Sequence, residues 1–395
     1  MRRLEFGFFD AGGGHRAAAT ALKMAIEGQQ RPWQVELANL QEILDPLDIL
    51  KKLTRIRIQD LYNTMLRNGW TLGSPQLLKV LQLVVKINHR GGVRLLEEYW
   101  RKTQPDMLVS FVPHFNRIMY ESFGHVFPGR PFVTILTDLA DYPPHFWIEP
   151  GKSQYFICGS DRAVAQAKSM GHPDGRIFRA SGMILHPRFY EPQTQDRAAG
   201  RQRLGLRPDL PTGLVLFGGY GSHEIREIAE RLDASKLGLQ LILICGKNAK
   251  LADDLRARQW RIPVFVEGFT SRVSEYMHLS DFFMGKPGPG SVSEALLMHL
   301  PVIVACNSWT LPQERYNADY IVEKHVGVVL RNFRDIERAA GQLVEPSALA
   351  RYRANTIALN NQAVFEIPTF LEKIFEETRE QASSANGAQL AGKTA

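Results

Sequence analysis

Residues 285–300 read GKPGPGSVSEALLMHL and run directly into the apolar stretch PVIVA at residues 301–305. A second apolar run at residues 282–284 precedes them, so the pattern predicts a strand, a turn and a helix in succession. The turn holds Gly288, Pro289 and Gly290, and Ser291 with Glu294 three residues on is typical of a capping box at a helix start. The backbone N–H groups of such a helix end suit a phosphate or diphosphate, and Glu294 is placed to accept hydrogen bonds from ribose hydroxyls. The alternative interpretation is a well-capped helix that binds nothing.

The composition indicates an ordinary globular protein of two domains. The chain has 395 residues, of which 44% are hydrophobic and 23% are charged. Its start does not resemble a secretory signal, and no stretch has the eighteen or so apolar residues that a spanning helix needs. The three cysteines, Cys158, Cys245 and Cys306, are widely spaced in apolar runs, which predicts reduced thiols in a cytoplasmic protein and no metal site.

The positive charge is concentrated in residues 51–102. This segment has eleven basic and three acidic residues, an excess that exceeds the net charge of +7 for the whole chain. A basic face attracts nucleic acid or an anionic membrane. Apolar residues recur at helical spacing in LLKVLQLVVKI at residues 77–87, with Trp70 nearby, which favours an amphipathic surface on a bilayer. No repeated aromatic pattern indicates nucleic acid. A core-packing helix with a solvated basic face is the alternative.

Strand and helix patterns alternate in both halves of the chain, which predicts an α/β fold with one Rossmann-like parallel sheet in each half. The expected strands lie at residues 4–9, 34–40, 107–112, 132–136, 155–158, 213–217, 240–245, 264–266, 282–284 and 302–305. A polar stretch near residues 193–211 predicts the boundary between a domain at residues 1–195 and one at residues 205–366. The small polar residues from 381 to 395 predict a disordered tail.

The first glycine loop, DAGGGHRAAATAL at residues 10–22, follows a predicted strand and opens a helix. Gly12, Gly14 and Ala17 fit the spacing G-x-G-x-x-A of dinucleotide sites, but the acidic residue that such a site needs after the second strand is missing. His15 lies in the turn itself, and a helix N-terminus disfavours the histidine cation, so His15 is a candidate neutral base.

Three more loops lie at predicted strand ends. The loop of Gly219, in LFGGYGSHEIREI at residues 216–228, repeats the glycine design without the G-K-[ST] of a nucleotide-hydrolysing P-loop. Gln313 and Glu314 follow the strand at residues 302–305, and such a pair suits sugar hydroxyls. The loop at residues 137–150 brings a candidate acid or base, Asp138, together with two candidate acceptor or membrane residues. These are His145 and Trp147, the latter as a sugar-stacking or membrane-interface ring.

Taken together, the motifs resemble the glycosyltransferase family that includes monogalactosyldiacylglycerol synthase and the processive diacylglycerol glucosyltransferases, which is related to the N-acetylglucosaminyl transferase of lipid II synthesis. The resemblance spans residues 4–329 and rests on D-x-GGGHR-x-A, CG-x-N at residues 245–248, V-x-GF at residues 266–269, K-x-GPG-[ST]-x-x-EA at residues 286–295, LP-V-I at residues 300–303 and QE-x-x-NA-x-x-(I/V)-V at residues 313–322.

The resemblance implies a GT-B fold, in which two Rossmann-like domains face a central cleft and a helix at residues 367–380 crosses back to the first domain. It implies an inverting reaction with a UDP-sugar, without metal or cofactor, and with His15 or Asp138 as the base. The implied UDP-sugar-binding residues are Gly14, Gly219, Gly246, Phe269, Gly288, Gly290, Ser291, Glu294, Gln313 and Glu314.

The expected reaction is hexose transfer to a membrane lipid, diacylglycerol or a glycosyl-diacylglycerol, by a protein peripheral on the inner face of the cytoplasmic membrane. Two other interpretations remain open. One is a transferase or epimerase of the same fold that uses UDP-N-acetylglucosamine, and the other is a non-catalytic protein that binds UDP-sugars.

Overall fold

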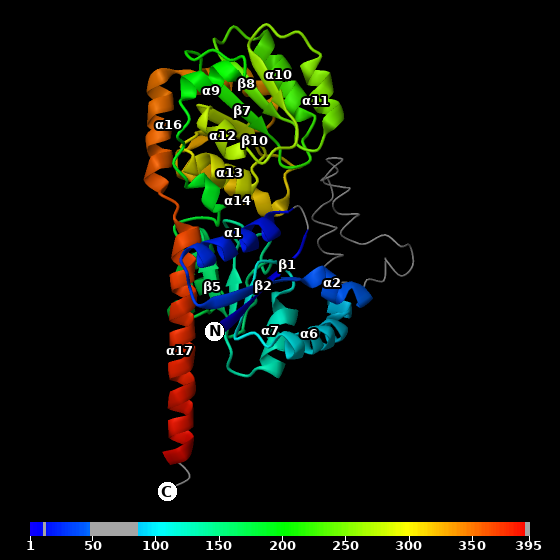
Figure 1. The fold of residues 1–395 in the computed structure, drawn as a ribbon, viewed down its shortest axis with the longest axis vertical. Coiled ribbons are helices and arrows are strands. Elements are labelled where there is room, and N and C mark those ends of the chain that lie inside the picture. The colour runs from blue at the N-terminus through cyan, green and yellow to red at the C-terminus, as the bar shows by residue number, and fades with distance from the viewer. Residues whose placement is uncertain (11–12, 48–85, 392–395) are drawn as a thin grey trace. The chain divides into compact units, whose positions relative to one another are not determined.

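The computed structural model describes residues 1–10, 13–47 and 86–391, with side chains as far as residue 381. The chain forms two units (Figure 1). The described residues up to Pro187 and those from Gln362 onward make the first unit, and residues 188–361 make the second. The first unit is therefore built from both ends of the chain.

The first unit is organised around a six-stranded sheet in the order β2-β1-β3-β4-β5-β6. All neighbouring strands are parallel, and Leu4 of β1 pairs with Val35 of β2 and Met107 of β3. The short central strands are buried, as the apolar runs of a parallel sheet require. The strands are β1 Arg2–Phe8, β2 Trp33–Asn39, β3 Met107–Ser110, β4 Phe132–Ile135, β5 Tyr155–Cys158 and β6 Ile177–Arg179.

Helices cover this sheet, and the last one comes from the C-terminal end of the chain. The helix α17 (Ala363–Ala391) packs against α1 (Gly14–Gly28) and adds Ile367, Leu371 and Ile374 to the core that Leu4 and other sheet residues form. The remaining helical segments are α2 Leu40–Leu44, η1 Asp45–Leu47, α6 His89–Thr103, α7 Asn116–Val126, α8 Asp161–Ser169, η2 Asp174–Arg176 and η3 Pro187–Phe189, of which η3 crosses the unit boundary.

The second unit repeats the design with the strand order β12-β11-β10-β7-β8-β9, again with all neighbours parallel. Residues Gly213 of β7 and Phe282 of β10 pair at its centre. The strands are β7 Thr212–Leu216, β8 Gln240–Ile244, β9 Val264–Glu267, β10 Phe282–Gly285, β11 Val302–Ala305 and β12 Gly327–Leu330.

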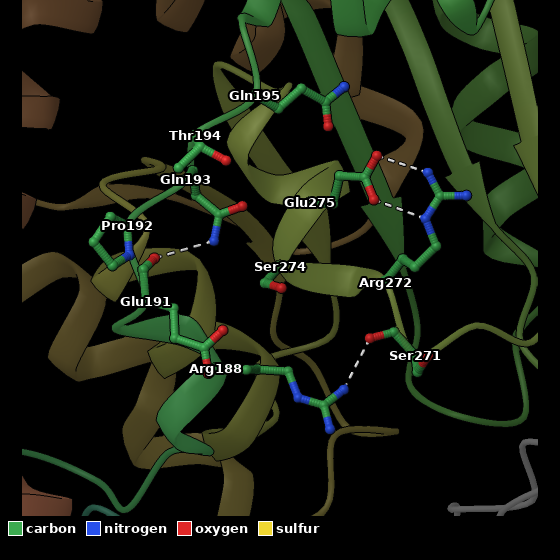
Figure 2. Close-up of a pocket in the computed structure, with 10 residues that line it drawn as sticks. All are labelled: Arg188, Glu191, Pro192, Gln193, Thr194, Gln195, Ser271, Arg272, Ser274 and Glu275. Carbon is green, nitrogen blue, oxygen red and sulfur yellow. Dashed lines mark hydrogen bonds and ion pairs between the residues drawn. The ribbon is translucent and has the colours of Figure 1, made fainter.

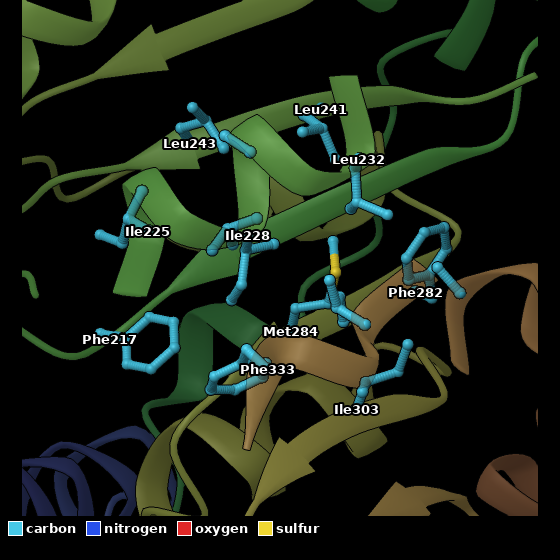
Figure 3. Packing of buried hydrophobic residues seen from close by; sticks show 14 of the residues in the cluster. Phe217, Ile225, Ile228, Leu232, Leu241, Leu243, Phe282, Met284, Ile303 and Phe333 are labelled. Atoms are coloured by element: carbon cyan, nitrogen blue, oxygen red, sulfur yellow. The ribbon is translucent and has the colours of Figure 1, made fainter. Parts of the chain in front are cut away.

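The core of the second unit lies between its sheet and the helices packed on it. Figure 3 shows Leu241 and Met284 from the strands close to Ile228 and Leu232 of α10 (Glu224–Ala234) and to Phe333. The other helical segments are α9 Arg197–Arg203, α11 Ala249–Arg256, α12 Val273–His278, α13 Pro289–Leu297, η4 Pro312–Glu314, α14 Arg315–Glu323, η5 Phe333–Asp335, α15 Ile336–Val344 and α16 Pro346–Leu359.

The two expected parallel sheets are confirmed, and each expected strand matches an observed one to within two residues at either end. Two strands, β6 and β12, were not predicted. Both lie at the edge of their sheets and are only partly buried, so their sequences lack the long apolar run of a central strand.

The expectation of a disordered tail from residue 381 is wrong as far as Ala391, because α17 continues to that residue. The same helix begins at Ala363, before the expected helix at residues 367–380. Alanine and glutamine recur in residues 381–391, and their high helix propensity is compatible with this extension.

The predicted membrane surface falls mostly on residues that the structure does not describe. Residues 51–85, including Trp70, lie outside the described ranges. Within those ranges, no helix has the combination of length and apolar character that crossing a bilayer requires.

Candidate active site

The second sheet has a topological switch point between β7 and β10. The chain adds β8 and β9 on one side of β7, then returns to place β10, β11 and β12 on the other side. Open parallel sheets bind ligands outside the carboxyl ends of the strands at such a point. The loop of Gly219 follows β7 and the turn of Gly288 follows β10, so two loops predicted from the sequence lie at the same place in the fold.

Two glycine loops interlock beside this switch point. A Cβ built on Gly221, which has a φ of 68°, would lie 2.2 Å from the carbonyl oxygen of Cys245. One built on Gly246, with a φ of 58°, would lie 2.5 Å from the carbonyl oxygen of Gly219. The N–H of Lys247 donates to that same oxygen at 2.9 Å. Packing therefore requires glycine at 246, whereas a Cβ on Gly219 would meet no atom of the described residues within 4 Å.

The N-cap of helix α13 lies three residues earlier than expected. Gly288 is its N-cap, Pro289 is its first residue and no side chain caps it, so the prediction of Ser291 as N-cap of a capping box is wrong. Proline favours the first helical position because its fixed φ suits the helix and its missing N–H is not needed there. The first helical bond runs from the N–H of Val292 to Gly288, which leaves the N–H groups of Gly290 and Ser291 without an intrahelical acceptor.

An ion pair lies next to this helix start. Lys286 Nζ is 2.6 Å from Glu314 Oε1, and Glu314 is buried. The side chain of Asn317 donates from Nδ2 to the carbonyl oxygen of Pro287 at 2.7 Å. Within the described part of the chain, Gln313 Oε1 and Asn317 Oδ1 are buried without a hydrogen-bond partner. The structure thus brings the predicted pair at 313 and 314 to the turn of α13, where unused acceptors remain.

Glu294, predicted to bind ribose, lies one turn into α13 and is partly exposed. Desolvation by the surrounding protein raises the pKa of its carboxyl group to about 7, against the opposing effect of the positive charge of Arg188. Hydroxyl groups that donate hydrogen bonds to such a desolvated carboxylate stabilise its charged form.

Phe269, one of the predicted UDP-sugar-binding residues, follows β9 and is 67% exposed. Lys247 Nζ lies 5.3 Å from the centre of its ring and 5.8 Å from the centre of the Tyr220 ring. An exposed ring beside the glycine loops is a suitable stacking surface for a base.

The first sheet has its own switch point, between β1 and β3, and His15 lies there. It is the second residue of α1, whose N-cap Gly13 has a φ of 83°. Its Nδ1 is 3.0 Å from Thr137 Oγ1, and its ring lies 5.8 Å from that of Trp147. Desolvation lowers the pKa of His15 to about 4, although a hydrogen bond with the backbone of Phe111 opposes this. The imidazole is therefore neutral near pH 7 and is able to accept a proton.

Asp138 and Trp147 support this histidine from inside the protein. Trp147 is fully buried, and its Nε1 donates to Asp138 Oδ2 at 2.9 Å. The prediction of Trp147 as a sugar-stacking or membrane-interface ring is therefore wrong, because its indole belongs to the core. The Trp147 ring is in T-shaped contact with the ring of His15, so the hydrogen bond from Trp147 to Asp138 helps to fix the position of a ring that lines the histidine site.

Asp141 is a structural residue of this loop that was not identified from the sequence. Its carboxylate accepts hydrogen bonds from the backbone N–H groups of His145 at 2.9 Å and Trp147 at 2.6 Å. Burial raises the pKa of Asp141 against these hydrogen bonds. The side chain of His145 is exposed, so this predicted acceptor residue remains accessible at the loop surface. Aspartate favours turns because its side chain accepts hydrogen bonds from nearby backbone N–H groups, so its place in this proline-rich loop was the only local signal for the role.

A separate shallow hollow in the second unit contains none of the predicted site residues (Figure 2). Three of its charged side chains are engaged with one another or with the backbone. Arg272 makes two bonds to Glu275 at 2.6 and 2.7 Å, and Arg188 donates to the carbonyl oxygen of Ser271 at 2.9 Å. Among the described residues, no cluster of three or more His, Cys, Asp or Glu side chains is placed to hold a metal ion.

Comparison with known proteins agrees with this architecture. Residues 214–346 match the glycosyltransferase family 28 C-terminal domain. Over 394 aligned residues, the chain is 28% identical to monogalactosyldiacylglycerol synthase of Spinacia oleracea. The alignment covers 93% of this chain and 72% of the spinach protein. The structure is similar to MurG of Acinetobacter baumannii, with a TM-score of 0.60 and 12% sequence identity. The superposition covers 94% of this chain and 100% of MurG. It is also similar to HepE of Anabaena in complex with UDP-glucose, with a TM-score of 0.52 and 16% sequence identity. That superposition covers 97% of this chain and 100% of HepE.

Proposed function

We propose that this chain, a glycosyltransferase whose residues 214–346 form a family 28 C-terminal domain, transfers a hexose from a UDP-sugar to a hydroxyl group of a membrane lipid. The acceptor that we infer is diacylglycerol or a glycosyl-diacylglycerol. The product is a β-glycolipid, formed with inversion and without a metal ion.

The observation that carries this proposal is the difference in chemistry between the two switch points. The second unit offers backbone N–H groups at Gly290 and Ser291, an exposed ring at Phe269 and a polar pair at 313 and 314. These groups suit the diphosphate, the base and the sugar of a UDP-hexose. The first unit offers a neutral histidine, which suits proton removal from an alcohol.

The likeness to the spinach synthase supports the lipid acceptor. That protein is named for the synthesis of monogalactosyldiacylglycerol, and the similarity extends over 93% of this chain, so it includes both units. HepE, whose fold is similar, was crystallised with UDP-glucose, which supports a UDP-sugar as the donor.

In the proposed reaction, His15 removes the proton from the acceptor hydroxyl as its oxygen attacks the anomeric carbon. The bond between that carbon and the β-phosphate oxygen breaks, and its electron pair leaves with UDP. Attack from the face opposite UDP turns an α-linked donor into a β-glycoside. The N–H groups at the start of α13 stabilise the charge that develops on the leaving diphosphate.

The basic segment at residues 51–102 is proposed to hold the enzyme on the inner face of an anionic membrane. Each lysine or arginine near such a surface contributes about 1 kcal/mol at moderate salt. Sedimentation with vesicles tests this: binding should require anionic lipid and weaken as salt rises. Equal binding to neutral and anionic vesicles would contradict the docking proposal and leave the transfer reaction untouched.

Incubation with radiolabelled UDP-glucose, UDP-galactose and UDP-N-acetylglucosamine on vesicles that contain diacylglycerol tests the reaction directly. We expect label in a lipid product whose glycosidic bond is β, and no label when diacylglycerol is left out. Conversion of UDP-N-acetylglucosamine without acceptor would favour an epimerase. Binding of UDP without transfer to any lipid would favour a non-catalytic binding protein.

A further inference from the structure

Lys286 lies where the two loops of the second switch point converge. It is the residue directly after β10, and a Cβ built on Gly288 would lie 3.3 Å from its Cε. A Cβ built on Gly218, in the loop after β7, would lie 3.9 Å from the same atom. The side chain of Lys286 is 41% exposed, so it reaches from the loops toward solvent. A cation is thus present where open parallel sheets bind their ligands.

The immediate surroundings of this ammonium group are rich in polar atoms. Glu314 Oε1 is 2.6 Å from Lys286 Nζ, and both Glu314 Oε1 and Ser291 Oγ lie 3.6 Å from the Cβ position of Gly288. Two further oxygens, Gln313 Oε1 and Asn317 Oδ1, are buried with no partner in the described ranges, and the Asn317 amide is fixed below the turn by its bond to Pro287. Asn317 is completely buried, so leaving its oxygen unpaired costs free energy that a donor group on a ligand would recover.

We propose that Lys286 binds the diphosphate of the nucleotide sugar and that Glu314 gives up its ion pair with Lys286 when that diphosphate binds. This inference rests on the proposed function and adds a residue to it. Two negative phosphate groups compete for the ammonium against one carboxylate. Once released, the Glu314 carboxylate is able to accept hydrogen bonds from hexose hydroxyls, so binding of the diphosphate and recognition of the sugar are coupled.

The role in catalysis follows from the charge balance of the transfer. When the bond from the anomeric carbon to the β-phosphate oxygen breaks, the electron pair stays on the oxygen and the diphosphate gains negative charge. The acceptor proton goes to His15, and Lys286 takes no part in the proton transfer. An ammonium group near the leaving oxygen stabilises the transition state more than the ground state, so its loss lowers kcat as well as donor affinity.

Calorimetric titration of the full chain with UDP and, separately, with uridine tests the proposal. Removing the charge in Lys286→Met should weaken UDP binding about 10- to 100-fold, the range expected for a lost charged hydrogen bond. Uridine lacks the diphosphate, so its affinity should change less than about twofold. Lys286→Arg should restore most of the UDP affinity, and Lys236→Met, an exposed lysine of the same unit, is the matched control.

Glu314→Gln provides a second variant whose expected effect has the opposite sign. It frees Lys286 from its competitor, so UDP should bind about two- to fivefold more tightly, the range for a partly exposed ion pair. A purely structural ion pair predicts weaker binding in both variants, with UDP and uridine affected alike, and that result would overturn the proposal. Unchanged UDP affinity in Lys286→Met would also overturn it. Failure of the unmodified protein to bind UDP would instead refute the proposed function.

Discussion

The two switch points of this molecule have the same topology and opposite chemistry. Between β1 and β3, a glycine turn leads into a helix that carries His15, enclosed by Trp147 and Thr137 and held neutral by desolvation. Between β7 and β10, a glycine turn leads into a helix with no capping side chain, next to the ion pair of Lys286 and Glu314.

This difference shows that the Rossmann-like framework sets where a site lies and that a few side chains set what it does. An aromatic, poorly hydrated wall at the first helix start disfavours charge, which suits a base. Bare amides and a cation at the second favour an anion. Each of the following predictions changes one side of this comparison.

The largest effect should come from His15→Ala. Loss of a general base commonly lowers the rate about 100- to 10,000-fold, while UDP affinity should stay the same because the change lies in the first unit. Steady-state transfer rates and calorimetric UDP binding measure the two effects, with His125→Ala, an exposed histidine of the same unit, as the control. Turnover near that of the unmodified enzyme would exclude His15 as the base and favour Asp138.

Gly290→Asp should separate the stability of the second site from its affinity. A Cβ at this position meets no described atom within 4 Å, and an acidic residue in the first turn favours the helix, so the free energy of unfolding should rise by about 1 kcal/mol. The same negative charge lies in front of the N–H groups that face a diphosphate, so UDP affinity should fall about tenfold or more. Gly290→Ala is the neutral control. Unchanged UDP binding in the aspartate variant would place the nucleotide elsewhere.

Trp147→Phe tests the assignment of this ring to the core. The variant loses the hydrogen bond from Nε1 to Asp138, so the free energy of unfolding should fall by about 1–2 kcal/mol. Vesicle binding should not change, because the indole is fully buried. Thermal unfolding and vesicle sedimentation provide the two measurements. Reduced membrane binding by a stably folded variant would restore the interfacial role.

The last prediction concerns pH, where the two units should respond in opposite directions. The pKa of His15 is lowered to about 4, so the unfolded chain binds this proton first and stability falls as pH decreases from about 6.5 to about 4. The pKa of Glu294 is raised to about 7, so the folded chain retains this proton and stability falls as pH rises from about 4.5 to about 7.

Denaturant unfolding at a series of pH values, in the unmodified protein and in His15→Gln and Glu294→Gln, measures these contributions. Each glutamine variant should flatten the stability curve in its own interval and leave the other interval unchanged. Identical curves for a variant and the unmodified protein would show that the group does not titrate as its surroundings indicate.

Local patterns were sufficient to predict the glycine loops and most strands. The run at residues 282–284 and the turn at Gly288 follow from apolar and turn residues that are adjacent in the chain, and they lie where expected. The exact start of α13 was not predicted, because the favourable first position of Pro289 outweighed the capping signal of Ser291. The edge strands β6 and β12 carried too little apolar signal.

The sequence by itself determined the two parallel sheets, the order of the loops at their carboxyl edges and the presence of a histidine at the first helix start, because each depends on neighbours within a few residues. Tertiary structure alone decided that Lys286 pairs with Glu314 and that Trp147 is an internal partner of Asp138. These contacts depend on how strands and loops distant in sequence pack together, and on how much water that packing removes, which no local pattern of residues encodes.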